Sequence, residues 1–195
     1  MEKNAVLFLA EGFEEVEATT PADYLRRAGI AVTLVAVGGE RAVRGARGIT
    51  VLADITLKEL AGAGKAGSGS WDAAVIPGGI PGASNIAASE AACALITEMA
   101  EAGKWVCALC ASPAVVLAPL GLLAGKGYTC YPGMETGLTE GEKRSAPVVV
   151  DGNLITASGA GTAGLFAVEI IRRLCGRAEG DRIAGSVLLG SASGS

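Results

Sequence analysis

Apolar runs of strand length alternate with segments of helical periodicity along the 195-residue chain, which predicts an α/β fold. Strands that are apolar throughout are buried on both faces, so we expect a mostly parallel sheet with helices on both faces. Ligands of such sheets bind beyond the carboxyl ends of the strands. The apolar runs lie at residues 4–10, 31–37, 73–76, 105–109 and 154–157. The helical segments lie at residues 14–28, 83–102 (in two pieces), 111–118 and 162–174.

Two further segments have the pattern of β-hairpins. Residues 41–51 are strand-like at both ends and carry Gly45 and Gly48 between them. Residues 148–150 are joined to 154–157 by the turn sequence Asp-Gly-Asn, which favours a tight reversal of the chain. We therefore expect two hairpins beside the parallel strands.

Low-complexity composition marks two segments as loops. Residues 62–70 read GAGKAGSGS and predict a flexible surface loop, and residues 190–195 read GSASGS and predict a flexible tail. The pattern of the chain contains no internal repeat and no second periodic unit. We therefore expect one domain over residues 1–189.

The composition narrows the class of protein. Half of the residues are hydrophobic, 18% are charged and the net charge is −4, with no block of Lys and Arg that would predict nucleic-acid binding. The five cysteines are an odd number and lack the spacing of a disulfide framework. The first apolar run is too short for a secretion signal, and the residues that follow it are too acidic. We expect reduced thiols and a cytoplasmic protein.

One uncharged stretch is about as long as a membrane span. Residues 106–125 carry no charge, but Pro113, Pro119 and Gly121 interrupt them. The stretch divides into a strand, a turn and a helix, which is the better interpretation. We expect no membrane-spanning segment.

Cys110 is the leading candidate for a nucleophile. It follows the apolar strand at 105–109 and precedes a helical segment that opens with Ala-Ser-Pro. Free N–H groups and a partial positive charge at a helix N-terminus stabilise a thiolate. The alternative is a small buried core residue, and the chain has no histidine that could take the proton of the thiol.

Two motifs near this segment have weaker functional interpretations. Cys107 and Cys110 form a C-x-x-C pair, but Cys107 lies within the strand, whereas a redox pair needs both sulfurs at the helix start. Gly159, Gly161 and Gly164 match G-x-G-x-x-G, the dinucleotide fingerprint, but no later strand completes a βαβ unit. A close-packed turn beside the site remains the alternative for these glycines.

Two other loops follow strand ends and should face Cys110. The first is the acidic stretch EGFEEVE, in which a solvated first helical turn accounts for Glu11, Glu14 and Glu15, whereas Glu17 lies between apolar neighbours and is expected to point inward. The second is IPGGIPGASN at 76–85, whose adjacent glycines expose backbone N–H groups of the kind that form an oxyanion hole.

Four fragments in order carry a family likeness: LFLAEGFEEVEATTPADYLRRAGI, VIPGGIPGASNI, CALCASPAVVLAPLGLLAGK and TASGAGTAGLFAVEII. Together they resemble the ThiJ/PfpI superfamily, in its DJ-1 branch, over residues 3–188. The resemblance implies a flavodoxin-like three-layer sandwich, related to class I glutamine amidotransferases, and a homodimer. It implies no cofactor and no metal.

The resemblance also implies roles for individual residues. Cys110 matches the cysteine of the nucleophile elbow, and Glu17 matches the glutamate that hydrogen-bonds to its sulfur. A protonated Glu17 would donate to the thiolate, so no histidine would be required. The amides of Gly79 and Ala111 match the oxyanion hole. The residues matched as support for the site or the dimer interface are Arg27, Arg47, Tyr131 and Gly159.

The chain departs from the family pattern at one position. Many members carry a histidine where this chain has Tyr131, in the sequence TCYPG. A tyrosine is a poor general base at neutral pH, so a Cys-His protease or amidotransferase mechanism is not expected. Proton transfer would have to use Glu17 or water.

The resemblance implies two main functions. The first is a cofactor-free glyoxalase or deglycase, in which the thiolate adds to methylglyoxal or its adducts and Glu17 moves a proton between carbons. The second is a sensor of oxidative stress or a chaperone, in which Cys110 is oxidised to a sulfinate without turnover. A role near thiamine biosynthesis rests on the superfamily name alone.

Overall fold

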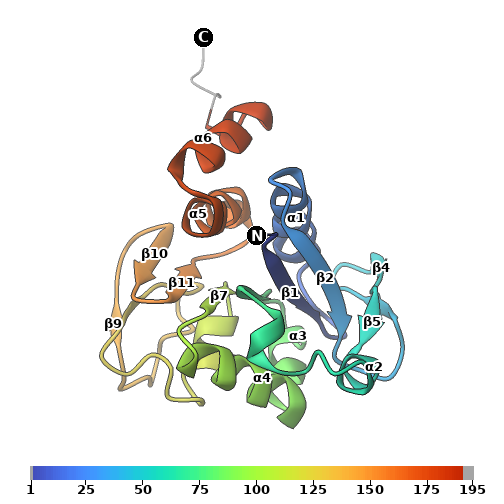
Figure 1. Cartoon of the computed structure of the whole chain (residues 1–195). Helices are drawn as coiled ribbons and strands as arrows, with labels where there is room; N and C mark the ends of the chain where they lie inside the picture. The colour runs from blue at the N-terminus through green and yellow to red at the C-terminus, as the bar shows by residue number, and fades with distance from the viewer. Residues whose placement is uncertain (1, 191–195) are drawn as a thin grey trace.

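The structure is a computed structural model that describes residues 2–190, and a seven-stranded sheet forms its centre (Figure 1). Every pair of neighbouring strands is parallel except the hairpin β10–β11 at one edge. The strands run, in spatial order, β10 (Val148–Asp151), β11 (Leu154–Ala157), β7 (Trp105–Leu109), β6 (Ala73–Ile76), β1 (Asn4–Leu9), β2 (Ala31–Ala36) and β5 (Ile55–Thr56).

Helices cover both faces of this sheet, which makes the fold the predicted flavodoxin-like three-layer sandwich (Figure 1). The helices above the sheet in the figure are α1 (Glu15–Arg27) and α5 (Ala163–Cys175), with α6 (Arg177–Ser186) packed on α5. The helices on the other face are α2 (Leu57–Gly62), α3 (Gly82–Ala87) and α4 (Glu90–Glu101).

Short elements complete the chain between these layers. The hairpin β3 (Ala42–Arg44) and β4 (Thr50–Leu52) is antiparallel, and the pair β8 (Gly127–Tyr128) and β9 (Glu142–Lys143) is parallel. The single helical turns are η1 (Ser68–Ser70), η2 (Pro113–Leu117) and η3 (Ala160–Thr162).

The core consists of two apolar layers, one on each face of the sheet. Along β1 the side chains of Leu7 and Leu9 belong to the layer beneath α1 and α5, whereas Val6 and Phe8 belong to the layer over α3 and α4. All four are completely buried, as the two-residue period of a strand covered on both faces requires. This packing fixes the strand ends that carry the site.

Most predicted elements are confirmed, but several short or polar ones were missed. The strands β6, β7 and β11 have the predicted bounds, and α5 begins and ends one residue after its prediction. The helix predicted at 111–118 is wrong in length, because only the wide turn η2 forms there. The helices α2 and α6 and the small strands β5, β8 and β9 had no sequence prediction.

The loop predicted at 62–70 is largely exposed but is tied to the fold. The backbone N–H and the hydroxyl of Ser68 both donate to Glu98 Oε1, at 3.0 and 2.8 Å. The indole N–H of Trp71 donates to the carbonyl of Lys65 at 3.0 Å. The predicted tail covers residues 190–195, and all of it except Gly190 lies outside the described residues.

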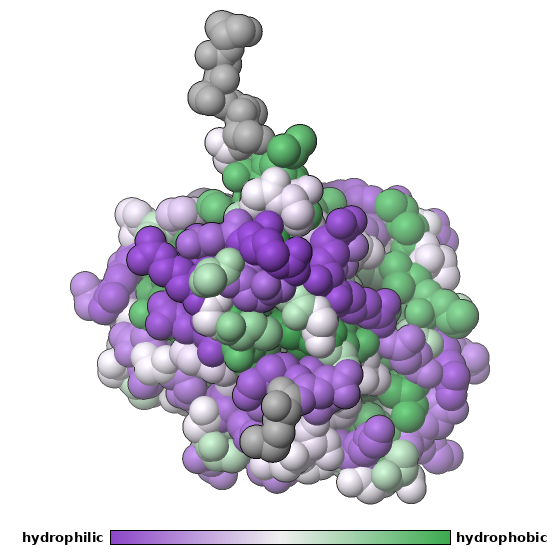
Figure 2. Space-filling model, turned by 45° about the horizontal axis from the view of Figure 1, so that its top comes forward, coloured by the Kyte–Doolittle hydropathy of each residue, from purple (hydrophilic) through white to green (hydrophobic). Residues whose placement is uncertain are grey.

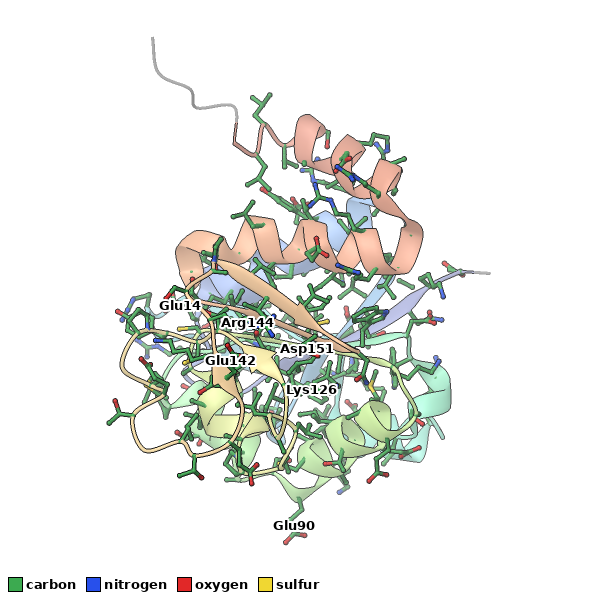
Figure 3. All side chains as sticks on the ribbon, turned by 90° about the vertical axis from the view of Figure 1, so that its left-hand side faces the viewer. Glu14, Glu90, Lys126, Glu142, Arg144 and Asp151 are labelled. Carbon is green, nitrogen blue, oxygen red and sulfur yellow. The ribbon has the colours of Figure 1, made fainter. Side chains whose placement is uncertain are left out.

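Charged residues bind the edge hairpin to the small sheet β8–β9 (Figure 3). Asp151 accepts a hydrogen bond from the backbone N–H of Gly127 at 2.8 Å and lies 3.9 Å from Lys126 Nζ. Arg144 lies 3.8 Å from both Asp151 and Glu142. This cluster stands apart from the strand ends where the candidate nucleophile lies.

The face over α5 and α6 is mainly hydrophilic (Figure 2). Its ion pairs include Arg172 with Asp181 and Arg173 with Glu169, both between 2.5 and 3.0 Å, with the Arg173 guanidinium 5.9 Å from the centre of the Trp105 ring. Among residues 2–190, no helix combines the length and the apolar character that crossing a membrane would take.

Candidate active site

Cys110 lies directly after β7 in a strained backbone conformation. Its φ is 62°, in the left-handed region that costs a residue with a side chain about 1–2 kcal/mol. Two hydrogen bonds hold this conformation: the N–H of Cys110 donates to the carbonyl of Ala157 at 2.9 Å, and its carbonyl accepts from the N–H of Tyr131 at 2.8 Å. The strain therefore persists because β11 and the loop after β8 impose it.

The loops after β1, β6 and β7 converge around this cysteine. The N–H of Glu14 donates to the carbonyl of Gly78 at 3.0 Å, which joins the first two loops. The buried hydroxyl of Ser112 donates to the carbonyl of Pro77 at 2.6 Å, which joins the second to the third. Ser112 was not predicted as a site residue, because a serine beside a nucleophile has no distinctive sequence pattern.

The two adjacent glycines leave no room for a side chain. A Cβ on Gly78 would lie 2.7 Å from Cys110 Cβ, 2.8 Å from Glu17 Oε2 and 2.9 Å from the amide nitrogen of Ala111. Gly79 has a φ of +86°, and a Cβ there would collide with the backbone of Glu14. The backbone of this loop therefore approaches the sulfur and the carboxyl more closely than any other residue type allows.

Glu17 is completely buried near the start of α1 and faces Cys110, as the sequence predicted. Its Oε2 accepts a hydrogen bond from the N–H of Gly78 at 2.9 Å. Its Oε1 has no hydrogen-bond partner among the described residues. The thiol of Cys110 and this carboxyl lie close enough to shift each other's pKa, but not in a geometry that satisfies Oε1.

The pKa of Glu17 is raised, in the predicted direction. Burial raises it from 4.5 to about 7, helped by the charge of Glu14 and opposed by the hydrogen bonds with Cys110 and Gly78. Because Oε2 already accepts from Gly78, the proton of a neutral Glu17 belongs on Oε1. Such a proton would point toward the sulfur.

The predicted lowering of the Cys110 pKa is wrong while Glu17 is ionised. Burial, the charge of Glu17 and the interaction with its carboxyl together raise this pKa to about 12, against the backbone N–H groups of Gly79 and Ala111, which lower it. The helix that follows is the single turn η2, so it supplies less of a dipole than expected. Two of the three causes that raise the pKa of Cys110 disappear when Glu17 takes a proton, so Cys110 and Glu17 are expected to share one proton.

A cavity of about 400 Å³ opens above these groups. Cys110 and Glu17 lie in its lining together with Gly79 and Ala111, whose backbone N–H groups lower the pKa of the Cys110 thiol. Backbone N–H groups of this kind can also donate to an oxyanion. The other lining residues are Glu14, Ala46, Arg47, Ile80, Tyr131, Met134 and Ala160.

The site thus combines a buried carboxyl, a strained cysteine and two backbone amides at the carboxyl ends of parallel strands. The family model of the DJ-1/PfpI family matches residues 3–173. The chain belongs to the DJ-1/PfpI family. The family match spans most of the chain.

Curated members of the DJ-1/PfpI family are similar to this chain over most of its length. Protein dj-1beta of Drosophila melanogaster is 37% identical, covering 97% of this chain and 98% of the fly protein. Protein DJ-1 homolog B of Arabidopsis thaliana is 39% identical over 93% of this chain, which spans only 40% of that protein. The protein named glutathione-independent glyoxalase DJ-1 in Schizosaccharomyces pombe is 31% identical, covering 88% of this chain and 91% of that protein.

Solved structures of DJ-1 proteins have the same fold. The crystal structure of Drosophila melanogaster DJ-1beta matches with a TM-score of 0.90 at 37% identity, covering 97% of this chain and all of the fly chain. The structure described as oxidized DJ-1 of Toxoplasma gondii matches with a TM-score of 0.90 at 32% identity, covering 96% of this chain and 99% of that chain.

The residues expected to support a DJ-1/PfpI site are only partly brought together. Arg47 lines the cavity, is largely exposed and lies 3.8 Å from Glu14. Tyr131 also lines it, and the absent Cβ of Gly159 would lie 3.5 Å from the Tyr131 ring. Arg27 does not reach the cavity, since it ends α1 and pairs with Asp23 at 2.8 Å.

The interpretation of Glu15 as a solvated residue is wrong. Glu15 is 4% exposed, and its Oε1 accepts from the N–H groups of Arg47 and Ile49 at 2.7 and 3.2 Å. Burial raises the pKa of Glu15, but hydrogen bonds from its own backbone N–H and from these two outweigh it and hold the pKa below 4.5. Glu15 therefore anchors the β3–β4 hairpin, which carries Arg47, to the start of α1.

The two weaker motifs gain no support from the geometry. Cys107 is completely buried within β7 and lines no part of the cavity, and burial raises the pKa of its thiol. The G-x-G-x-x-G segment 159–164 forms the turn η3 and opens α5. No strand follows it in residues 2–190, so no βαβ unit forms around it.

The raised pKa of Glu17 predicts a pH dependence of stability. A carboxyl with a higher pKa in the folded state binds more protons there, so the free energy of unfolding should fall as pH rises from 4.5 to about 7. A shift of this size is worth about 3 kcal/mol at about 1.4 kcal/mol per unit. Urea unfolding of the wild type and of Glu17→Gln across this pH range measures the effect. Parallel pH profiles for the two proteins would contradict the assignment.

Proposed function

We propose that this protein is a cysteine-dependent, cofactor-free enzyme that converts small 2-oxoaldehydes such as methylglyoxal into 2-hydroxy acids. The observation that carries the proposal is the buried, unpartnered Oε1 of Glu17 beside Cys110, with the amides of Gly79 and Ala111 directed at the same sulfur. A nucleophile, a proton carrier and an oxyanion hole are thus combined without a histidine.

The first step forms a hemithioacetal. The proton of the Cys110 thiol passes to Glu17 Oε1, and the thiolate attacks the aldehyde carbon, forming a C–S bond while the C=O electron pair moves to oxygen. The N–H groups of Gly79 and Ala111 are positioned to stabilise this oxyanion. Glu17 then returns its proton to the oxyanion, which leaves a neutral hemithioacetal and an ionised carboxylate.

The second step moves a proton between two carbons. The carboxylate of Glu17 takes the C–H proton of the hemithioacetal, which gives an enediolate with its negative charge on the oxygen of the neighbouring carbonyl. The hydroxyl proton of the hemithioacetal passes to that oxygen, and Glu17 delivers its own proton to the second carbon. The product is a thioester of the 2-hydroxy acid on Cys110. A base with a pKa of about 7 suits this shuttle at neutral pH.

The last step is hydrolysis. Water attacks the thioester carbonyl in the same oxyanion hole, the C–S bond breaks, and one proton of the water returns the sulfur to a thiol. The sum is methylglyoxal plus water giving lactate and a proton. The name of the fission yeast relative, a glutathione-independent glyoxalase at 31% identity, supports an activity of this class.

Conversion of methylglyoxal to lactate by purified protein tests the proposal. We expect turnover by the wild type and none by Cys110→Ser, because the weakly acidic hydroxyl does not form the adduct. Cys93→Ser is the matched control, since Cys93 lies outside the cavity and donates to backbone carbonyls of α3. A wild type that makes no lactate, or a Cys110→Ser variant that makes as much, would refute the proposal.

A second candidate function is supported by the structure of oxidized Toxoplasma DJ-1, which has the same fold. In this function Cys110 is a redox sensor or chaperone switch: the thiolate and two molecules of hydrogen peroxide give a sulfinate and two waters. A protonated Glu17 and the amides of Gly79 and Ala111 would donate to the sulfinate oxygens. Peroxide treatment followed by peptide mass mapping should show two added oxygen atoms on Cys110 before any other cysteine, and equal oxidation of Cys175 would count against it.

We further propose that the protein is a homodimer. Exposed apolar side chains on α1, the β3–β4 hairpin and α5 support a contact surface, and they are Val16, Ile49, Leu52 and Leu165. Sedimentation equilibrium should give about twice the monomer mass of 19.4 kDa. Leu52→Glu should then shift the equilibrium toward monomer, and a wild-type monomer at micromolar concentration would contradict the proposal.

A further inference from the structure

The mouth of the cavity is apolar on the side where the group attached to the ketone carbon of a 2-oxoaldehyde would lie. Ile80 and Tyr131 line it and are 55% and 53% exposed, and Met134 is half-buried beside them. The charged residues of the lining above Glu17 are Glu14 and Arg47, which lie 3.8 Å apart and offset each other. The wall formed by Ile80, Tyr131 and Met134 is here called the apolar wall.

Backbone hydrogen bonds connect the apolar wall to the nucleophile. The N–H of Tyr131 donates to the carbonyl of Cys110 at 2.8 Å, and the N–H of Met134 donates to the carbonyl of Tyr131 at 3.0 Å. The Tyr131 ring also stands against Gly159, whose missing Cβ leaves it van der Waals room. The backbone of Tyr131 is thus bonded directly to that of the reacting residue, and the backbone of Met134 is bonded to it through Tyr131.

The volume of the cavity exceeds what a three-carbon substrate fills. At about 400 Å³ it lies within the range of about 300–1,000 Å³ found for sites that hold drug-sized ligands. A methyl group beside the reacting carbonyl would leave the apolar wall in contact with water. A larger apolar group would cover it and gain the free energy of that burial.

We propose that the site prefers 2-oxoaldehydes that carry an aromatic or bulky apolar group over methylglyoxal, and that Tyr131 is the main residue that confers this preference. The inference rests on the proposed function and deepens it. With phenylglyoxal, the thiolate adds to the aldehyde carbon, Glu17 moves the C–H proton to the carbon that bears the phenyl ring, and water releases mandelate. The phenyl ring would lie against Tyr131, where aromatic pairs gain beyond simple burial.

The test compares kcat/KM for phenylglyoxal and methylglyoxal in the wild type and in variants of the wall. Intrinsic reactivity of the two aldehydes is the same for every variant, so it cancels when their ratios are compared. We expect Tyr131→Ala to lower the ratio by about tenfold, the scale on which apolar contacts discriminate between substrates. Tyr131→Phe should keep the ratio, since it keeps the ring, and Ile80→Ala should lower it by a smaller factor.

A matched control removes an apolar side chain elsewhere. Leu188 is 74% exposed and outside the cavity lining, so Leu188→Ala should leave the ratio unchanged. If the wild type turns over both aldehydes and Tyr131→Ala keeps the wild-type ratio, the inference about the wall is wrong while the proposed function stands. A ratio that falls equally in Tyr131→Phe would assign the effect to the hydroxyl and would also overturn it.

A second measurement decides the inference if neither aldehyde is turned over. The rate of Cys110 alkylation by N-phenyliodoacetamide, divided by the rate with iodoacetamide, reports the same wall without turnover. The background carries Cys175→Ser, because Cys175 is also exposed. We expect this ratio to fall in Tyr131→Ala and not in Tyr131→Phe. Absent turnover with a falling alkylation ratio would refute the proposed function alone, and an unchanged alkylation ratio would refute the wall.

Discussion

Replacing Glu17 with glutamine is expected to abolish carbonyl turnover and to lower the pKa of Cys110. The charge of Glu17 and its hydrogen bond are two of the three causes that raise that pKa to about 12, and both depend on the carboxyl. Glutamine keeps the shape and removes the charge, so a fall of at least about one pKa unit is expected. Glutamine cannot exchange a proton, so turnover should fall by about 100-fold to 10,000-fold.

Thiolate absorbance against pH, with Cys110→Ser as the blank, measures this pKa. Glu17→Ala is the comparison, because it also removes the charge but leaves the N–H of Gly78 without an acceptor and offers no donor to the sulfur. The expected order of the Cys110 pKa is therefore wild type above Glu17→Ala above Glu17→Gln. A Cys110 pKa that changes with neither substitution would show that Glu17 and Cys110 are not coupled. Full turnover by Glu17→Gln would leave Glu17 a structural residue.

The second large effect is expected from Gly78→Ala. Its Cβ would lie within 3.0 Å of Cys110 Cβ, Glu17 Oε2 and the amide nitrogen of Ala111 at once. The Ala111 nitrogen is a backbone atom, and Cys110 Cβ is attached to a backbone that hydrogen bonds already fix, so the loop after β6 must move away from the sulfur. A displacement of this kind costs about 100-fold in turnover, and overpacking costs about 1–3 kcal/mol of stability.

Gly69→Ala is the matched control, because no atom lies within 4 Å of the Cβ that it would add. Turnover and urea unfolding of both variants, with an alkylation rate for Cys110, separate loss of geometry from loss of fold. We expect Gly69→Ala to match the wild type in all three. Normal turnover by Gly78→Ala would contradict this prediction, because it would show that the loop after β6 can make room for the added Cβ.

The sequence predicted the fold well where apolar burial alone decides the structure. β6, β7 and β11 are buried runs whose ends are marked by proline, glycine or polar residues, and their bounds were predicted without error. The helix α6 was missed because it contains Gly180 and Gly185 and few apolar residues. It forms because Ile183 is buried and Asp181 pairs with Arg172, which are tertiary contacts that no local pattern encodes.

The burial of Glu17 beside Cys110 was predicted from the sequence, but the raised pKa of the thiol was not. The position of Cys110 after a strand could be read from the sequence, whereas its positive φ is imposed by Ala157 and Tyr131, which are distant in the sequence. At the start of α1 two neighbouring residues reverse the usual relation of burial to hydrophobicity, since Val16 is 46% exposed and Glu17 is completely buried. The raised pKa of the thiol follows from that burial and charge, which the sequence does not specify.

The two hydrogen bonds that hold Cys110 come from residues that are synthesised after it, Tyr131 and Ala157. During translation the cysteine therefore leaves the ribosome before either partner exists. Glu17 and the glycine loop are already present, but the backbone turn that directs the sulfur at them forms only when β11 has joined the sheet beside β7. Cys110 is therefore an ordinary thiol in the growing chain, and its strained conformation forms only after β11 has paired with β7.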